Sequence, residues 1–309
     1  MQQLTRNILM IRPANFGLNT QTALNNAFQS KEVVLDINLL RDLAVAEFDI
    51  MVTILKSKGI NVFVFQDTEI PIKPDAVFPN NWISFHRNGA VITYPMFAPN
   101  RRDERREEII NYIGSIFKIH NRYSFEFYEN DDQPLFLEGT GSMVLDRVNH
   151  MVFACISDRT DATLLDKFNV LMGTQSYVFK AVDKDGFEIY HTNVMMALGV
   201  DFVIIAMQSI PDEDSRKELY RIFDKTGKEV IEISLKQVES FAGNMLEVLG
   251  SGNKRYLCMS QTAYNSLTKT QIEKLSAKTE LLPLSIPNIE KYGGGSVRCM
   301  MAEIFLHEK

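Results

Sequence analysis

Apolar segments alternate with short polar turns along most of the chain, and the pattern repeats. Four segments share one order: a polar residue, an apolar strand, a tight turn, a second apolar strand and a stretch typical of a helix. They open at Asn81, Ser142, Asn193 and Asn244, so the last two steps are 51 residues each and the first is 61. One more step of 51 residues reaches Gly295, at the start of the last apolar strand.

Local sequence signals agree with this repeat. Turn formers such as Asn88-Gly89 and Gly252-Asn253 lie between paired strands. Residues 215–223 have the apolar spacing of an amphipathic helix. Outside the four segments, residues 7–13 predict a strand, residues 37–55 a helix and residues 61–65 another strand.

Each repeat unit is therefore predicted to contain two or three strands and a helix, and about five such units account for the length of the chain. An open solenoid needs polar capping repeats, whereas apolar strands occupy both ends of this chain. We therefore expect an α/β fold in which the units close into a ring. The alternative is a two-domain α/β protein in which the equal spacings are coincidental.

Composition narrows the function classes. The chain has 309 residues, of which 45% are hydrophobic and 23% charged, and its formal net charge is −6. An acidic balance argues against nonspecific nucleic-acid binding, which needs a basic surface. Three cysteines are too few for a disulfide framework and suit a reducing compartment. With neither a signal-peptide pattern nor an apolar run of about 20 residues, we expect a cytoplasmic protein without membrane contact.

Candidate chemistry follows from the repeat. In a ring of repeats, equivalent strand starts converge near the axis, so their polar residues are candidates for a central site. They include a carboxylate, an imidazole and a thiol, and the candidates are Asn81, Glu138, His191, Asn244 and Cys299. A thiol acts as a nucleophile when it is ionised, and a neighbouring histidine favours the ionised form.

The three cysteines differ in context. Cys155 and Cys258 lie inside apolar strands and are interpreted as structural thiols, whereas Cys299 follows the glycine run 293–295. Taken alone, Cys299 is equally consistent with a core thiol. Likewise, His191 could be a satisfied histidine at a strand end, and Glu138 could be a carboxylate that caps backbone N–H groups.

Other patterns indicate no further site. Neither a paired-cysteine motif nor a phosphate-binding loop occurs, so we expect no metal and no cofactor. The charge run 101–108 is typical of a solvated helix face with ion pairs between neighbouring turns. Because a closed ring leaves few exposed edges, nothing compels dimerisation, although an oligomer is possible.

Three motifs occur in order along the chain: LEGTG, YHTN and GGGSVRC. Together they resemble the guanidine-modifying enzymes, also called the pentein superfamily, whose members share a five-bladed ββαβ propeller with a Cys–His–Glu/Asp site at its centre. The resemblance covers essentially the whole chain, and it implies a single domain over residues 1–309. It also implies that Cys299 is the nucleophile, His191 the general acid and base, and Glu138 the catalytic carboxylate.

Further positions carry over from the same resemblance. The segment PDAVFPNN resembles a family segment that begins with one aspartate and ends with another, and Asp75 matches the first. Arg102 and Arg159 resemble arginines that hold a substrate carboxylate, a role that suits the bidentate geometry of a guanidinium. We therefore expect a small amino acid as the substrate.

Two departures change the expected substrate. Guanidine-binding members grip the substrate cation with two aspartates, at positions that match Asn81 and Asn193 here. An asparagine can donate its NH₂ to a ureido oxygen while its own carbonyl accepts from a ureido N–H. Two amides in place of two carboxylates favour a neutral ureido substrate, of which L-citrulline is the simplest. The overall sequence also resembles the branch known as citrulline utilisation hydrolases, often grouped with amidinotransferases.

The resemblance implies a mechanism without a cofactor. Cys299 attacks the ureido carbon, and an S-carbamoyl enzyme forms and is hydrolysed, so that ornithine, ammonia and carbon dioxide are the products. Two alternatives stay open. One is an arginine-directed amidinotransferase or deiminase. The other is a non-catalytic binding module, since translation initiation factors use the same architecture.

Overall fold

The computed structural model describes residues 2–22, 29 and 36–309. These residues form two compact units. Unit 1 contains Thr140–Ser285 and the start of the chain up to Leu4, and unit 2 contains Thr5–Gly139 and Ile286–Lys309. The expectation of a single domain over residues 1–309 stays a prediction.

Unit 1 contains, in the part of the chain that is described, three three-stranded sheets with one topology. In each sheet an antiparallel pair is followed by a third strand that runs parallel to the second. The sheets comprise β6 (Val144–Asp146), β7 (Met151–Cys155) and β8 (Gln175–Phe179); β9 (Met196–Leu198), β10 (Phe202–Ile205) and β11 (Glu229–Glu232); and β12 (Leu246–Leu249), β13 (Arg255–Ser260) and β14 (Glu280–Leu284).

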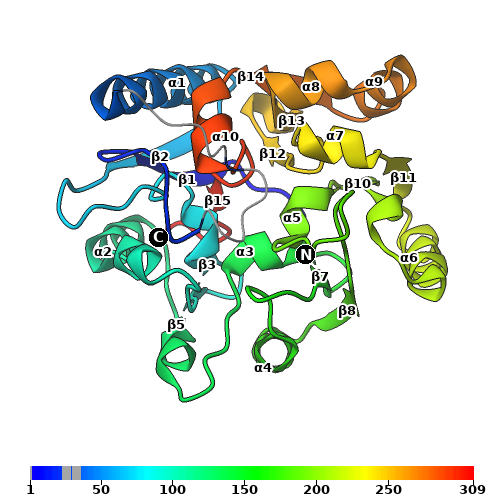
Figure 1. Ribbon diagram of the computed structural model, residues 1–309, viewed down its shortest axis with the longest axis horizontal. Coiled ribbons are helices and arrows are strands. Elements are labelled where there is room, and N and C mark those ends of the chain that lie inside the picture. Colours follow the sequence, from blue (N-terminus) through cyan, green and yellow to red (C-terminus); the bar gives the residue numbers. More distant parts are fainter. Residues whose placement is uncertain (1, 23–28, 30–35) are drawn as a thin grey trace. The chain divides into compact units, whose positions relative to one another are not determined.

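Helices connect the second and third strands of these sheets, as the repeat predicts (Figure 1). The connecting helices are α4 (Ala162–Met172), α6 (Glu213–Lys225), α8 (Gln261–Ser266) and α9 (Lys269–Ser276). Shorter elements of unit 1 are α5 (Thr192–Met195), η4 (Met207–Ser209), α7 (Leu235–Glu239) and η5 (Ser251–Asn253), and α3 (Gly139–Ser142) spans the boundary between the two units along the chain.

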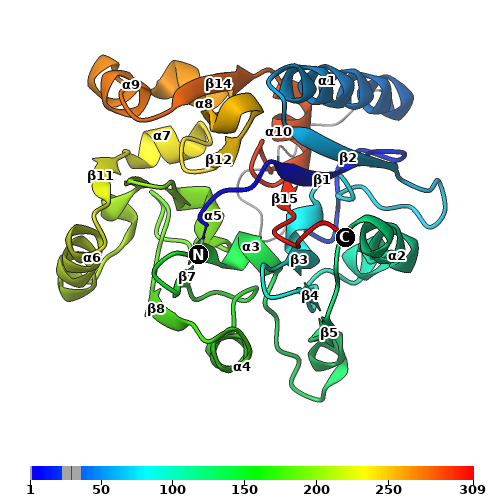
Figure 2. The same ribbon diagram turned by 180° about the vertical axis from the view of Figure 1, so that it is seen from behind.

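Unit 2 contains two further sheets of the same kind within the described ranges. One comprises β3 (Ile83–Phe85), β4 (Ala90–Thr93) and β5 (Asn121–Ser124). The other combines both ends of the chain, because β15 (Ala302–Glu303) runs antiparallel to β1 (Asn7–Arg12), which runs parallel to β2 (Asn61–Gln66). Both views show β1 between these two partners (Figures 1 and 2). Hence the predicted last strand completes a sheet with the first.

The helical elements of unit 2 are α1 (Ile37–Ser57), η1 (Pro79–Asn81), η2 (Pro99–Glu104), α2 (Glu107–Ile116), η3 (Glu126–Asn130) and α10 (Pro287–Gly293). The helix predicted over residues 37–55 is confirmed as α1, which Asp36 caps by accepting from the N–H groups of Asn38 and Leu39. Within the described residues, every helix is too short or too polar to cross a bilayer.

Buried strands explain why the sequence repeat is so regular. All four residues of β4 and of β10 are buried, so β10 appears in the sequence as a continuous apolar run and β4 as three apolar residues before Thr93. In unit 2 the core gathers residues of β1, β3, β4, α2 and β15 around Trp82. Trp82 is buried directly after Asn81, and it therefore fixes the end of η1 against the core.

Candidate functional site

The candidate residues occupy equivalent places in the sheets. A short turn, helical before β3, β6 and β9, precedes the first strand of each described sheet, and the polar candidates lie at these turns. Asn81 ends η1, Glu138 precedes α3 and His191 is the N-cap of α5. Asn244 follows the turn before β12, and Cys299 lies in the turn before β15. The repeat thus places all five at the start of a sheet.

Unit 2 brings Asp75 and Asn81 together around a buried arginine, Arg101. Its Nε and Nη2 donate to the two carboxyl oxygens of Glu104 at 2.8 and 2.9 Å. Its Nη1 donates to Oδ1 of Asn81 at 3.0 Å, and its Nε lies 3.8 Å from Oδ2 of Asp75. The same Asp75 oxygen accepts from Nδ2 of Asn19 at 2.7 Å. These contacts form a polar cluster at the end of η1.

Sequence reasoning did not identify Arg101 or Glu104. The charge run 101–108 was expected to be a solvated helix face, and this is wrong for its first part. η2 ends at Glu104 and α2 begins at Glu107, while Arg101 and Glu104 are each 3% exposed. The only signal in the sequence was their spacing of three residues, which brings them to one face of a tight helical turn.

More acidic than basic side chains act on the polar cluster around Arg101. Burial opposes the charge of Arg101, but Glu104, Asp75 and Glu138 together raise its pKa above the ordinary value. Burial raises the pKa of Glu104 to about 7, Arg101 opposes this effect, and Asp75 and Glu138 add to it. Three carboxyl groups therefore act on one guanidinium in a buried setting.

The raised pKa of Glu104 predicts a stability profile. The folded protein keeps a proton on Glu104 between about pH 4.5 and 7, where the unfolded chain has lost it, so the free energy of unfolding falls through this window. We expect Glu104→Gln to remove this contribution. From pH 4.5 to 8, the unfolding free energy of the wild type should drop by about 1–3 kcal/mol relative to that of the variant.

Urea unfolding of both proteins at several pH values checks this expectation. Glu108→Gln is the matched control, because Glu108 is exposed and Arg106 lowers the pKa of its carboxyl group. A difference between wild type and Glu104→Gln that stays constant with pH contradicts the expectation.

Contacts fix the orientation of the Asn81 amide. A guanidinium has only donors, so the atom that faces Arg101 must be the amide oxygen. The other end, Nδ2, is buried and has no hydrogen-bond partner among the described residues. The amide oxygen, for which the sequence suggested a ureido N–H as the donor, already accepts from Arg101. Asn81 therefore offers a buried N–H donor.

Glu138 lies beside the same segment. Its side chain is fully buried, and Oε1 accepts from the backbone N–H of Phe97 at 2.9 Å. The next residue, Gly139, has a φ of 46°, and a Cβ there would collide with the carbonyl oxygen of Asn80. Only glycine allows the two backbones to approach this closely. This contact explains the first glycine of the LEGTG motif.

Cys299 differs from the other cysteines in accessibility. It is 7% exposed, and its N–H donates to the carbonyl oxygen of Ser296 at 2.9 Å. Cys155 and Cys258 are fully buried, which confirms that they are core thiols. Burial raises the pKa of Cys155 to about 12 and raises that of Cys258 as well, so both stay protonated at neutral pH.

In unit 1, His191 and Arg159 both lie close to the ring of Tyr190. The ring centroids of Tyr190 and His191 are 4.8 Å apart, and the guanidinium carbon of Arg159 lies 4.8 Å from the Tyr190 centroid. The side chains of His191 and Arg159 are both buried. Sequence reasoning missed Tyr190, although it directly precedes His191.

The same unit fixes the turn that follows His191. Thr192 donates to the carbonyl oxygen of Ser142 at 2.6 Å and accepts from the N–H of Cys155 at 2.8 Å. Nδ2 of Asn244 donates to the backbone oxygen of Asn193 at 3.0 Å. Asn244, a candidate from the repeat, therefore supports the turn that carries Asn193.

Arg102 lies apart from the Asp75–Asn81 cluster. Its Nε donates to the carbonyl oxygen of Met96 at 3.1 Å and lies 3.6 Å from a carboxyl oxygen of Glu129. Of the two adjacent arginines, it is Arg101 that contacts Asp75 and Asn81. The grouping of Cys299, His191 and Glu138 into one catalytic site, and the carboxylate clamp by Arg102 and Arg159, stay predictions.

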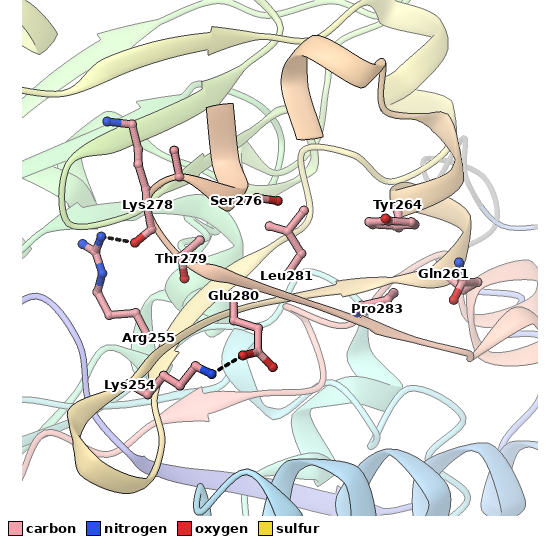
Figure 3. Close-up of a pocket in the computed structure, with 11 residues that line it drawn as sticks. Lys254, Arg255, Gln261, Tyr264, Ser276, Lys278, Thr279, Glu280, Leu281 and Pro283 are labelled. Atoms are coloured by element: carbon pink, nitrogen blue, oxygen red, sulfur yellow. Dashed lines mark hydrogen bonds and ion pairs between the residues drawn. The ribbon is translucent and has the colours of Figure 1, made fainter. Parts of the chain in front are cut away.

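A separate pocket of about 790 Å³ lies in unit 1, and none of the predicted site residues lines it. Figure 3 shows two interactions among the residues that line it: Lys254 pairs with Glu280, and Arg255 donates to the carbonyl oxygen of Lys278. In the described part of the chain, no group of three or more histidine, cysteine, aspartate or glutamate side chains could hold a metal ion.

Comparisons with known structures match the fold over nearly the whole chain. The product-bound N-terminal domain of ArgZ, an arginine dihydrolase from the ornithine-ammonia cycle in cyanobacteria, is 16% identical with a TM-score of 0.75, covering 96% of this chain and 97% of that one. An AgrE mutant in complex with L-arginine is 16% identical with a TM-score of 0.75, covering 96% of this chain and 40% of that one.

A third structure is the dimethylarginine dimethylaminohydrolase (DDAH) of Pseudomonas aeruginosa, as a cysteine-to-serine mutant complexed with citrulline. It is 14% identical with a TM-score of 0.64, covering 98% of this chain and all of that one. At these identities the likeness shows the fold alone, and it confirms the predicted α/β fold of five ββαβ units. A search of the curated proteins found no match.

A comparison with sequence models of protein families identifies the family of this chain. The model described as "N,N dimethylarginine dimethylhydrolase, eukaryotic" matches residues 12–306, which is nearly the whole chain. The predicted resemblance to the guanidine-modifying enzymes is therefore confirmed. This chain belongs to the N,N-dimethylarginine dimethylhydrolase family, and hence to the guanidine-modifying enzymes of the pentein type.

Proposed function

We propose that this protein is a cysteine-dependent hydrolase that removes the ureido group of L-citrulline. The observation that carries the proposal is the fixed orientation of Asn81. Its oxygen is engaged by Arg101, and its buried N–H has no partner among the described residues. A donor left unsatisfied in a buried setting costs about 1–3 kcal/mol. A ureido oxygen would satisfy it, whereas a guanidinium, which carries only donors, would not.

In the proposed first step the thiolate of Cys299 attacks the ureido carbon. Protonated His191 first stabilises the thiolate and then gives its proton to the nitrogen that carries the alkyl chain. The C–N bond to that nitrogen breaks, ornithine leaves, and a carbamoyl group stays on the sulfur. Glu138 orients a ureido N–H during this step.

In the second step water attacks the carbonyl carbon of the carbamoyl group. His191, now neutral, takes a proton from the water, and the C–S bond breaks to regenerate the thiolate. The released carbamate decomposes to ammonia and carbon dioxide. Asp75 holds the substrate next to Asn81 and Asn193, and Arg102 and Arg159 hold its carboxylate. The two steps together consume only L-citrulline and water.

A second candidate is hydrolysis of a guanidino substrate such as arginine. It is favoured by the charge of the Asp75 cluster, in which three carboxyl groups act on a single guanidinium. A further cation would find compensation there. The structural relatives also point this way, because ArgZ is described as an arginine dihydrolase.

Citrulline labelled with ¹³C at the ureido carbon distinguishes the outcomes. The proposal predicts that the label appears in bicarbonate, with one ornithine and one ammonia formed for each citrulline consumed. Acid quenching during turnover should trap a labelled carbamoyl group on the peptide that contains Cys299, detectable by mass spectrometry. Label that stays in unchanged citrulline, while arginine is consumed, would favour the second candidate instead.

A further inference from the structure

A buried carboxyl group lies next to the loop that carries Cys299. Glu290 belongs to α10 and is buried, and the hydroxyl of Ser296 donates to its Oε1 at 2.6 Å. Ser296 is itself fully buried. This contact is the short, strong kind of hydrogen bond that a hydroxyl makes with a carboxyl oxygen. Nothing in the proposed chemistry assigns a role to either residue.

Ser296 connects this carboxyl group to the nucleophile. Its hydroxyl binds Glu290, and its carbonyl oxygen accepts the backbone N–H of Cys299 at 2.9 Å. The next two turns also close, because the N–H of Met300 donates to the carbonyl oxygen of Val297 and that of Met301 to the carbonyl oxygen of Arg298, each at 3.2 Å. A shift of Ser296 would therefore move the backbone of Cys299 directly.

Glycines let the same loop pack against the substrate-binding segment. A Cβ on Gly293 or on Gly295 would lie 2.8 Å from the ring of Phe78, closer than side chains normally approach. Phe78 lies between Asp75 and Asn81 in the sequence. The loop that carries Cys299 therefore packs closely against Phe78, and the Glu290–Ser296 bond holds the same loop from α10.

The helix that carries Glu290 is anchored in turn. Glu47 of α1 accepts from the backbone N–H groups of Asn288 and Ile289, each at 3.0 Å, at the first turn of α10. Both views show α10 beside α1 (Figures 1 and 2). A carboxylate at these N–H groups satisfies donors that have no partner within the helix. These contacts with Glu47 fix the position of α10, and therefore that of Glu290.

We propose that Glu290 is a positioning residue for Cys299. Through Ser296 it holds the turn in which the thiol reaches the substrate carbon. The inference rests on the proposed function only in taking Cys299 as the nucleophile, and it is independent of which substrate is used. A misplacement of about 1 Å can cost about 100-fold in rate.

Two variants test the Glu290–Ser296 hydrogen bond. A third separates the loss of this bond from the loss of a carboxyl group at position 290. Glu290→Ala and Ser296→Ala each remove it, whereas Glu290→Gln keeps an acceptor oxygen for the serine hydroxyl. We expect the first two to lower kcat for L-citrulline by about 10- to 100-fold with KM changed less than about threefold. Glu290→Gln should retain kcat within about fivefold of the wild type.

Alkylation of Cys299 by iodoacetamide, followed by mass spectrometry, is the second readout and needs no substrate. We expect its rate to fall in Glu290→Ala and Ser296→Ala and to recover in Glu290→Gln. Glu247→Gln is the matched control, because Glu247 is an equally buried carboxyl group in β12 that accepts from the N–H of Val200. It should lose stability without a change in the alkylation rate.

The outcomes are distinct. Unchanged kcat and alkylation in Ser296→Ala overturn the inference, and so does an equal loss in Glu290→Gln and Glu290→Ala, which would assign the effect to charge. If L-citrulline proves not to be a substrate, the proposed function fails, while the alkylation rates still decide whether Glu290 positions the thiol. Should Glu290→Ala fail to fold, Ser296→Ala provides the same comparison.

Discussion

Replacing Cys299 with alanine is expected to lower kcat for L-citrulline by at least about 1000-fold while the protein stays folded. Covalent catalysis has no substitute when the nucleophile is removed, since neither of the other cysteines can take its place. The substitution removes one sulfur atom from a turn, so the free energy of unfolding should change by about 1 kcal/mol. Product formation and urea unfolding measure the two effects.

Cys258→Ala is the control for this experiment. Cys258 is fully buried within β13, and burial raises the pKa of its thiol. Its removal should leave kcat unchanged and reduce the free energy of unfolding by about 1–2 kcal/mol through the cavity it creates. If Cys299→Ala retains activity, or if Cys258→Ala loses it, the assignment of the nucleophile is wrong.

The double substitution Asn81→Asp with Asn193→Asp is expected to change substrate preference. Two buried carboxylates attract a guanidinium and repel the lone pairs of a ureido oxygen. We expect kcat/KM for L-citrulline to fall by at least about 100-fold and the affinity for L-arginine to rise by about 10-fold. Asn81→Asp alone should gain less for arginine, because Arg101 lies 3.0 Å from Oδ1 and would neutralise the new charge.

Calorimetric titration of both amino acids into the Cys299→Ala background separates binding from turnover. Asn88→Asp is the control for an Asn-to-Asp change as such, because it adds one negative charge at an exposed turn where Oδ1 still accepts from the N–H of Ala90. An arginine affinity that does not rise in the double variant would mean that Asn81 and Asn193 do not contact the reacting group.

The fold could be predicted because its strands are buried in a regular way. Fully buried strands such as β4 and β10 leave runs of three or four apolar residues in the sequence, and turn formers separate them. The helix α1 was predicted to within a few residues for the same reason, since its apolar face has a clear period. The sheet that joins β15 to β1 was harder to foresee, because β15 has only two residues.

The polar cluster could not be predicted with the same success. Arg101 and Glu104 belong to a dense charge run, and charged runs are normally solvated. Arg101 is buried against Asp75 and Asn81, which lie at least 20 residues away in the sequence and meet it only in the folded chain. Pairing between distant charges leaves no local pattern.

Short turns escaped prediction for a different reason. The helical turns η1, α3 and α5 have three or four residues each, too few to show a helical period. Their positions followed from the repeat, which placed Asn81, Glu138 and His191 at equivalent strand starts. Motif resemblance then supplied the roles of these residues, and their contacts could be described only from the structure.

The most direct test of the account is the ratio of kcat/KM for L-citrulline to kcat/KM for L-arginine in the wild type, with ornithine release as the common readout. The orientation of Asn81 predicts a preference for citrulline of at least about 100-fold. Equal or faster release of ornithine from arginine would contradict it, and would show that the three carboxyl groups around Arg101, rather than the amide of Asn81, decide which substrate is bound.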